Sequence, residues 1–258
     1  MKKTLIKIWT FWCLFITAWV FLVLLPFNLI LIYFFGDKGR DFLVYYSRYL
    51  GDLLIFLFGM RKVVTGNHPM KHNEPCIYIV NHKSYLDVII VASLISNKLK
   101  YLGKEEMFSW PLFGPFVKKT RAMIPVKRDS KESRQKSYDL MKKALKEGFS
   151  IILFPEGGWR NHNQDKFDHP YELKENVLLQ DFRNGAFRLA LDAKVPVLPI
   201  ALLNAQERFT DLKMRVVPGK IKIHIFDLID SNLYQDSFDL NYKCHSLILG
   251  QLKSYQLK

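Results

Sequence analysis

A histidine and an aspartate five residues apart, His82 and Asp87, follow directly after the apolar run of residues 77–80. Histidine can act as a general base because its ordinary pKa lies near neutral pH. A carboxylate bonded to its second ring nitrogen would hold the ring in one tautomer. Five residues turn a regular helix by about 140°, so the side chains can meet only if His82 precedes the helix and Asp87 lies in its first turns. A carboxylate at a helix start is also common for capping alone, so the pair by itself is ambiguous.

A second strand end carries polar residues as well. Residues 150–154 read as a buried strand that leads into Glu156, Gly157 and Arg160. Open α/β sheets place their sites at such strand ends. The second segment therefore strengthens the case that His82 and Asp87 belong to an active site.

Four blocks in order resemble one known family. They are Asn81-His82-x4-Asp87, then residues 103–106 with 111–114 and 124–128, then residues 154–157, and finally residues 195–200. Each block alone is unspecific, but their order and spacing over roughly residues 75–205 are similar to those of the glycerolipid acyltransferases. Within that family the chain looks most like the 1-acylglycerol-3-phosphate acyltransferases.

This resemblance implies a reaction and a set of roles. An acyl group would move from a thioester, on coenzyme A or on an acyl carrier protein, to the free hydroxyl of a lysophospholipid. His82 would be the general base and Asp87 its orienting partner, with no metal and no bound cofactor. The acceptor's glycerol phosphate would be held by residues of the second and third blocks: Lys104, Arg128, Glu156, Gly157 and Arg160.

The third block departs from the family pattern. The family usually has an arginine two positions after Glu-Gly, whereas here Gly158 and Trp159 precede Arg160. The acceptor could therefore be another lyso-lipid, such as a lyso-aminolipid or lysophosphatidylglycerol. A thioesterase or phospholipase is a further alternative, although no serine stands in a nucleophile-elbow context. A non-catalytic membrane adaptor is the third, and the intact His82 and Asp87 argue against it.

The N-terminal segment has the length and composition of a membrane-associated element. No charged residue occurs between Lys7 and Asp37, a stretch of 29 residues, which as a helix would be about 44 Å long. Pro26 is expected to divide it into two helices, and the basic residues on both flanks favour a pair that dips into one leaflet over a single spanning helix. We expect a membrane-associated helical element over residues 1–62 and an α/β acyltransferase domain over residues 63–258.

The formal charge of +14 also points to a membrane. Residues 118–146 contain eleven basic and three acidic residues, a pattern found in nucleic-acid binders and in proteins that attach to anionic lipid. The long apolar N-terminus favours the lipid surface and argues against nucleic acid. An acidic acyl carrier protein would be steered by the same field. We expect a catalytic domain on the cytoplasmic face of the cytoplasmic membrane.

The rest of the chain alternates strand and helix signals, which predicts a mixed α/β sheet flanked by helices. Strands are expected at residues 77–80, 100–102, 122–126, 151–154, 197–202 and 220–225, the last as a half-exposed edge strand. Helices are expected at residues 85–96, 131–147 and 184–194. The three cysteines show no pairing or metal-ligand spacing and read as small apolar residues in a reducing compartment.

Overall fold

The computed structural model describes residues 3–67, 74–95, 98–127, 129–157, 177–210 and 215–257. Within these ranges a seven-stranded sheet forms in the order β1-β9-β6-β2-β5-β3-β4. The strands are β1 Met60–Gly66, β2 Ile77–Val80, β3 Leu99–Lys104, β4 Met123–Val126, β5 Ser150–Leu153, β6 Val197–Leu202 and β9 Gly219–Ile225. All neighbours are parallel except β6 and β9. The mixed α/β sheet expected from the sequence is therefore confirmed.

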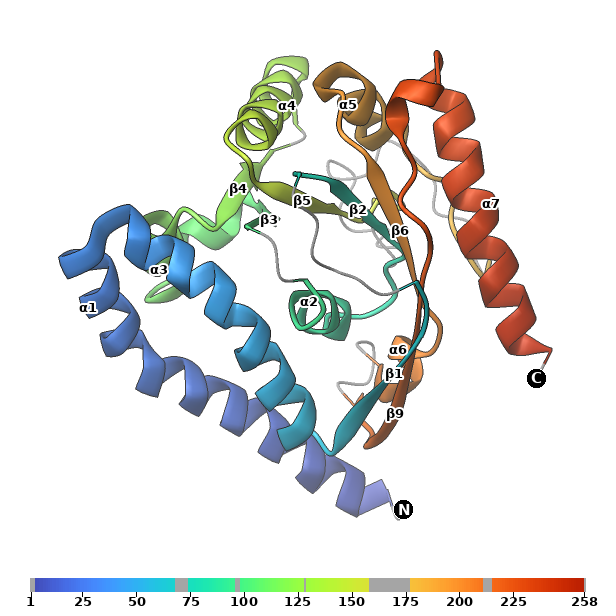
Figure 1. Cartoon of the computed structure of the whole chain (residues 1–258). Coiled ribbons are helices and arrows are strands. Elements are labelled where there is room, and N and C mark those ends of the chain that lie inside the picture. The colour runs from blue at the N-terminus through green and yellow to red at the C-terminus, as the bar shows by residue number, and fades with distance from the viewer. Residues whose placement is uncertain are drawn as a thin grey trace.

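Helices cover both faces of this sheet (Figure 1). One face carries α1, α2 and α3, and the other carries α4, α5 and α7. The helices are α1 Lys3–Leu57, α2 Leu86–Ala92, α3 Phe113–Thr120, α4 Lys131–Lys146, α5 Gly185–Ala193, α6 Ala205–Arg208 and α7 Ser237–Gln256. Shorter elements are the 3₁₀ turns Glu105–Ser109 and Ser231–Leu233 and the strand pair β7 Phe209–Thr210 and β8 Arg215–Val216.

The central position of β2 in the sheet explains why its sequence is apolar throughout. Side chains of a strand point alternately to the two faces, and here Ile77 and Ile79 join the core beneath α5 and α7. Tyr78 and Val80 join the other core, beneath α1 and α2. All four side chains are fully buried, as expected for an inner strand of a sheet covered on both faces.

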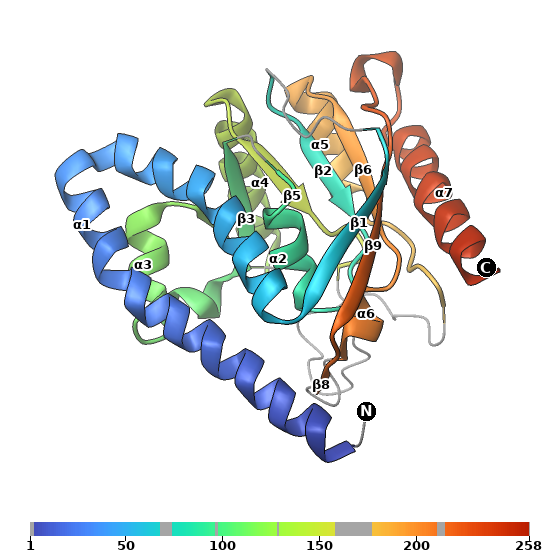
Figure 2. The ribbon, with the colours of Figure 1, turned by 60° about the horizontal axis from the view of Figure 1, so that its bottom comes forward.

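The α1 segment is a helical hairpin whose break differs from the expected one. The helix continues through Pro26 and breaks at Gly36, whose φ of 53° and ψ of −122° are not helical. A proline removes only one backbone donor, and the first arm is held along the domain by Phe21, whose ring meets those of Phe113 and Phe116. The expected division at Pro26 is therefore wrong. Figure 2 shows the two arms side by side against the rest of the protein.

Much of the hairpin surface is apolar and exposed. Large exposed apolar side chains include Phe11, Trp12, Phe15, Trp19, Phe27, Ile30, Phe34, Phe42, Tyr45, Tyr49 and Phe56. By length and composition alone this helix passes for a membrane span. Exposed apolar area on this scale is unusual on a soluble protein and is consistent with membrane association. The same helix also enters the core through Cys13, Leu54 and Ile55, and β1 begins at Met60, just before the expected domain boundary at residue 62.

The C-terminal half of the sheet corrects another expectation. The alternating segment of residues 220–225 does form β9, but this strand is internal and not an edge strand, because β1 pairs with it in parallel. Its outward lysine is covered by a helix: the ammonium of Lys222 lies 4.7 Å from the ring centre of Tyr255 on α7. The polar sequence of β1 does not predict a strand, so its pairing with β9 was not expected.

Other elements match with small shifts. Ser130 caps α4 through a 3.0 Å hydrogen bond from the backbone N–H of Ser133, and this helix ends before Gly148 as expected. The helix predicted over residues 85–96 is shorter, because α2 ends at Ala92. Cys13, Cys76 and Cys244 are buried and unbridged, in agreement with their interpretation as small apolar residues.

Candidate active site

The carboxyl end of β2 is fixed to its neighbour β6 by Asn81. Its side-chain amide donates to the carbonyl of Leu202 at 2.9 Å, and its side-chain oxygen accepts from the N–H of the same residue at 2.7 Å. Asn81 is buried. This side chain continues the sheet pairing beyond the last strand residue, so the chain leaves the sheet at a defined point and His82 begins from a rigid base.

His82 and Asp87 meet as the spacing required. Asp87 lies in the first turn of α2, whereas His82 lies in the turn before that helix. Oδ2 of Asp87 is 2.9 Å from Nδ1 of His82. The same oxygen accepts from the backbone N–H groups of Lys83 at 2.7 Å and Ser84 at 2.8 Å. Asp87 is therefore both the cap of the turn and the partner of the imidazole, and its side chain is 1% exposed.

Aromatic packing and a hydroxyl hold the rest of this turn. The ring of His82 stacks on Phe154, with ring centres 4.0 Å apart and planes 21° from parallel. Ser84 donates from its hydroxyl to the carbonyl of Phe209 and accepts from the N–H of Leu86. Ser84 thus has contacts suited to starting the helix. The imidazole of His82 is left 12% exposed, enough to reach a bound molecule from a fixed position.

Glu156 lies beneath the histidine. It follows β5, the parallel neighbour of β2, and its side chain is fully buried. Oε1 accepts from the backbone N–H of His82 at 2.7 Å, and Oε2 accepts from the N–H of Gln180 at 2.9 Å. Burial raises the pKa of Glu156, while the nearby Lys83 ammonium and these hydrogen bonds oppose the shift. A carboxyl in this position reaches an acceptor only indirectly, through the backbone that it holds.

Lys83 is a site residue that the sequence analysis did not single out. Its ammonium lies 3.5 Å from Oε2 of Glu156 and 3.5 Å from the carbonyl of Val177. It therefore links the turn after β2 to the turn after β5. Nothing in the sequence distinguished it from an ordinary exposed lysine except its place directly after His82.

Gly157 shows why the third block needs glycine. Its φ of +77° is in the left-handed region, which glycine adopts at little cost. A Cβ at this position would also collide with the guanidinium of Arg183. The backbone N–H of Arg183 donates to the carbonyl of Pro155 at 2.9 Å. Arg183 is thus a second cation beside the site that was not singled out from the sequence.

The other predicted residues are only partly described. Lys104 is the last residue of β3 and is exposed. β3 is parallel to β5, so Lys104 lies at the same edge of the sheet as the residues after β2 and β5. Arg128 and Arg160 lie outside the described residues. Within the described ranges no group of three or more His, Cys, Asp and Glu residues could hold a metal ion.

Comparison with known sequences identifies the family. The profile of the family named Acyltransferase matches residues 61–203, more than half of the chain. The chain therefore belongs to the acyltransferase family. The matched region begins in β1 and ends just after β6, so it includes both strand ends that build the site.

Individual relatives are named 1-acyl-sn-glycerol-3-phosphate acyltransferase. One from Cocos nucifera is 22% identical over 213 residues, which make up 82% of this chain and 64% of that protein. One from Haemophilus influenzae is 26% identical over 204 residues, 78% of each chain. The chain thus spans less than two thirds of the coconut protein and more than three quarters of the bacterial one.

A solved structure shares the fold over the whole length. The 1-acyl-sn-glycerophosphate (LPA) acyltransferase PlsC from Thermotoga maritima superposes with a TM-score of 0.80 and covers 100% of this chain and 99% of its own. The sequences are 17% identical. The likeness therefore establishes a common fold, which includes the N-terminal hairpin as well as the sheet.

Proposed function

We propose that this protein transfers a fatty acyl group from a thioester to the free hydroxyl of 1-acylglycerol-3-phosphate, giving phosphatidate. The observation that carries the proposal is the 2.9 Å contact between Nδ1 of His82 and Oδ2 of Asp87 at the end of the central strand. The relatives from coconut and Haemophilus influenzae, whose names state this reaction, support it.

The geometry supports base catalysis without a covalent acyl-enzyme. With its Nδ1–H donating to Asp87, the imidazole of His82 takes the hydroxyl proton of the acceptor at Nε2. The hydroxyl oxygen attacks the thioester carbonyl, so a C–O bond forms as the C–S bond breaks. The imidazolium then returns the proton to the departing thiolate sulfur. The buried Asp87 carboxylate stabilises the imidazolium between these two transfers.

The phosphate of the acceptor requires cations near this edge of the sheet. Lys104, Arg128 and Arg160 are our candidates, and arginine suits a phosphate because its planar fork donates two hydrogen bonds at once. Arg183, packed against Gly157, is a fourth candidate. Glu156 and Gly157 contribute through the shape of the turn, Glu156 by holding the backbone of His82 and Gly157 by leaving room for Arg183.

The acyl donor is acyl-CoA or an acyl carrier protein, and no resident cofactor is needed for this chemistry. Either donor leaves as a thiol, so the roles of His82 and Asp87 are the same. The basic residues of 118–146 would attract both the phosphates of coenzyme A and an acidic carrier protein. The hairpin α1 would place the site at the cytoplasmic surface of the cytoplasmic membrane, where lysophospholipid acceptors enter from the lipid.

A second candidate function rests on the displaced arginine. Because Arg160 stands one position later than the family pattern, the acceptor could carry a different head group, such as a lyso-aminolipid or lysophosphatidylglycerol. The chemistry at His82 would be unchanged, and only the cations around the head group would serve another purpose.

The test is an acceptor panel with the detergent-solubilised protein and a labelled acyl thioester. We expect labelled phosphatidate from lysophosphatidate at a higher kcat/KM than product from any other lyso-lipid. Product from a different lyso-lipid alone would overturn the acceptor assignment and favour the second candidate. Labelled free fatty acid with every acceptor would overturn acyl transfer itself.

A further inference from the structure

A second cavity lies away from His82. It has a volume of about 1300 Å³ and lies beside the edge strand β4, between the second arm of α1, α3 and α4. Neither His82 nor Asp87 nor Glu156 contributes to its lining. Its floor includes Val44, Ile124 and other apolar side chains, whereas its rim carries seven lysines or arginines and five acidic residues. The cavity therefore leaves out the catalytic pair, carries more cations than carboxylates, and borders the second sequence block through Glu105 and Lys127.

Lys100 on β3 is a partly buried cation of this cavity. Its ammonium lies 4.5 Å from the ring centre of Phe149, and within the described residues it forms no ion pair with a carboxylate. Burial lowers the pKa of Lys100, Glu147 opposes this, and Arg121 and Lys143 lower it further. Glu147, Arg121 and Lys143 therefore all lie close enough to act on the Lys100 ammonium.

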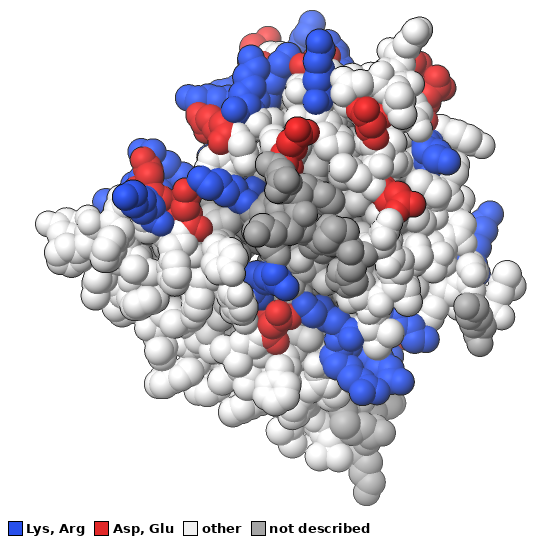
Figure 3. Space-filling view, viewed as in Figure 1, with Lys and Arg blue, Asp and Glu red and all other residues white. Residues whose placement is uncertain are grey.

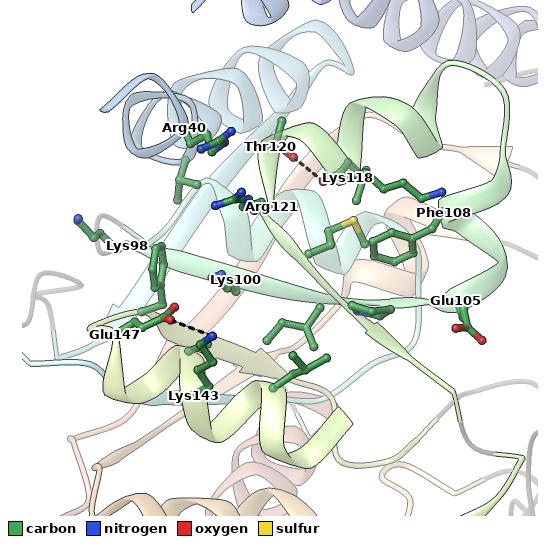
Figure 4. A pocket seen from close by; sticks show the side chains of 18 of the residues that line it. Arg40, Lys98, Lys100, Glu105, Phe108, Lys118, Thr120, Arg121, Lys143 and Glu147 are labelled. Carbon is green, nitrogen blue, oxygen red and sulfur yellow. Dashed lines mark hydrogen bonds and ion pairs between the residues drawn. The ribbon is translucent and has the colours of Figure 1, made fainter. Parts of the chain in front are cut away.

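Three more cations surround this end of the cavity, as Figure 4 shows. Their ion pairs are Lys98–Asp41 at 2.6 Å, Arg121–Asp37 at 3.8 Å and Lys143–Glu147 at 3.9 Å. Lys98, Arg121 and Lys143 are each more than half exposed. Exposed pairs of this kind contribute little stability, so the cations can turn to a stronger acceptor. A phosphate group offers several oxygens that accept charge-assisted hydrogen bonds together.

Arg121 lines the cavity from the C-terminal end of α3. Arg121 ends α3 in the left-handed conformation, with φ 53° and ψ 20°. Glycine or asparagine is the usual residue at such a helix end, because other side chains pay a steric cost there. The guanidinium of Arg121 lies beside Asp37, with 3.8 Å between Nη1 and Oδ1, and Figure 4 shows Arg121 and Lys100 at the same end of the cavity.

The surroundings indicate where the phosphate comes from. The second arm of α1 lines the cavity with Arg40, Asp41 and Val44, and the exposed aromatic residues Phe42 and Tyr45 follow on the same arm. Figure 3 shows a cluster of charged side chains at the border of the uncharged surface formed by the hairpin. If that uncharged surface lies in lipid, the cavity opens at the depth of the head groups.

We propose that this cavity is a second anion site, in which Lys100, Arg121 and Lys143 bind the phosphate of a membrane lipid head group. The site is separate from the acceptor site at the carboxyl ends of β2 and β5, and it holds the protein on membranes that contain anionic lipid. It rests on the membrane association of the hairpin but not on the proposed reaction.

The test compares two double variants of the full chain that lose equal charge. Lys100→Met with Arg121→Asn removes two cations of the cavity; methionine keeps the apolar stem, and asparagine tolerates the left-handed backbone. Lys136→Gln with Lys146→Gln removes two cations of α4 that do not line the cavity. Partitioning onto phosphatidylcholine vesicles with and without phosphatidylglycerol is measured for each, with the unfolding temperature in detergent as the check that both variants fold.

We expect the cavity variant to lose at least about fivefold more of the preference for anionic vesicles than its control, because a discrete site adds to the general attraction of basic residues. Equal losses in the two variants would overturn the proposal. Free inorganic phosphate is added as a competitor at constant ionic strength. Competition that depends on the cavity residues would support the anion site, and its absence would contradict binding through the phosphate.

Two single variants test the same site if the double variant does not fold. Lys143→Gln and Lys146→Gln lie on the same exposed turn of α4, and only Lys143 lines the cavity. The first should reduce the preference for anionic vesicles by about two- to threefold more than the second, because each variant loses one charge of the general attraction but only Lys143 belongs to the proposed site. Identical behaviour of this pair would contradict the site.

Discussion

His82 is positioned by residues that do not need to touch a substrate. Asp87 holds its ring at Nδ1, and Glu156 holds its backbone N–H. Lys83 offsets part of the charge of Glu156. Two blocks of sequence, residues 81–87 and 154–157, thus meet around one imidazole. Asp87 orients the ring, and Glu156 orients the backbone of His82.

The substitution Glu156→Gln should separate these roles. Glutamine keeps the size of the side chain but presents one NH₂ group to a backbone N–H that needs an acceptor, so His82 should shift. A misplacement of this kind can cost about 100-fold, and we expect kcat to fall by about 10- to 100-fold while KM for the acceptor changes less than about threefold. Steady-state kinetics measures both. A large rise in KM with kcat unchanged would instead indicate direct contact with the acceptor.

The same residue should make stability depend on pH. Burial raises the pKa of Glu156 above its usual value of 4.5, so the folded protein holds this proton more strongly than the unfolded chain. The stabilisation is fully present below pH 4.5 and is lost as the pH rises through the raised pKa. Relative to Glu156→Gln, the wild type should therefore lose stability from about pH 4.5 upward. Thermal unfolding of both proteins in detergent across pH 4 to 8 checks this, and a constant difference would contradict it.

At the scale of elements, each strand end is tied to its neighbours before the active residues begin. Asn81 joins β2 to β6, and the turn after β5 is tied to residues 180 and 183 through Glu156 and Pro155. The short helix α2 is placed by its core contacts, since Leu86, Ile90 and Val91 are buried against the face that α1 covers. The site is thus as rigid as the parallel strands that carry it.

Gly157 offers a test of the turn after β5, with Gly148 as its matched control. Both have a left-handed φ, +77° and +84°, but a Cβ would meet Arg183 at Gly157 and open space at Gly148. Gly148→Ala should lower the free energy of unfolding only by the cost of placing alanine in a left-handed backbone conformation, about 1–2 kcal/mol. Gly157→Ala should cost more and also lower acyl transfer. Unfolding midpoints and activity of both variants measure this. Equal effects would show that the Arg183 side chain can move away from the added Cβ without loss of stability or activity.

The sequence alone was sufficient to locate a helix or strand where one physical signal dominated. The Ser130 cap and the Gly148 stop located α4, and the fully apolar runs located β2, β5 and β6. It was insufficient where the signal depended on distant partners. β1 has a polar sequence and is stabilised by β9, so neither the strand nor the internal position of β9 could be predicted. Lys83 and Arg183 lie at the site only because the turns after β2 and β5 pack together in the folded protein, which their local sequence does not indicate.

At the scale of the molecule, the hairpin and the sheet form one structure. Cys13, Leu54 and Ile55 of α1 share a core with β2, β6 and α2, so the apolar outer face of the hairpin has a fixed relation to the site. A break at Gly36 allows both arms to lie along the domain, which a division at Pro26 would not explain. The hairpin thus fixes which side of the protein can face a bilayer.

The exposed face of the hairpin should carry most of the affinity for membranes. Phe15→Glu with Trp19→Glu places two charges among exposed aromatic residues of α1, and a charged side chain at the centre of a membrane helix costs up to about 3 kcal/mol. Phe238→Glu with Tyr242→Glu changes two aromatic residues on α7 that are even more exposed. Sedimentation with neutral vesicles should show strong release of the first variant and little change in the second. Similar binding of both would show that another surface meets the lipid.

The central claim is that His82 is the base for acyl transfer, and the most direct measurement is the turnover of His82→Ala with a labelled acyl thioester and lysophosphatidate. The account predicts a fall of kcat by about 10²- to 10⁴-fold, the usual contribution of a positioned base, with unfolding temperature and vesicle binding near those of the wild type because His82 is not part of the buried core. Turnover of the folded variant at the wild-type rate would contradict it.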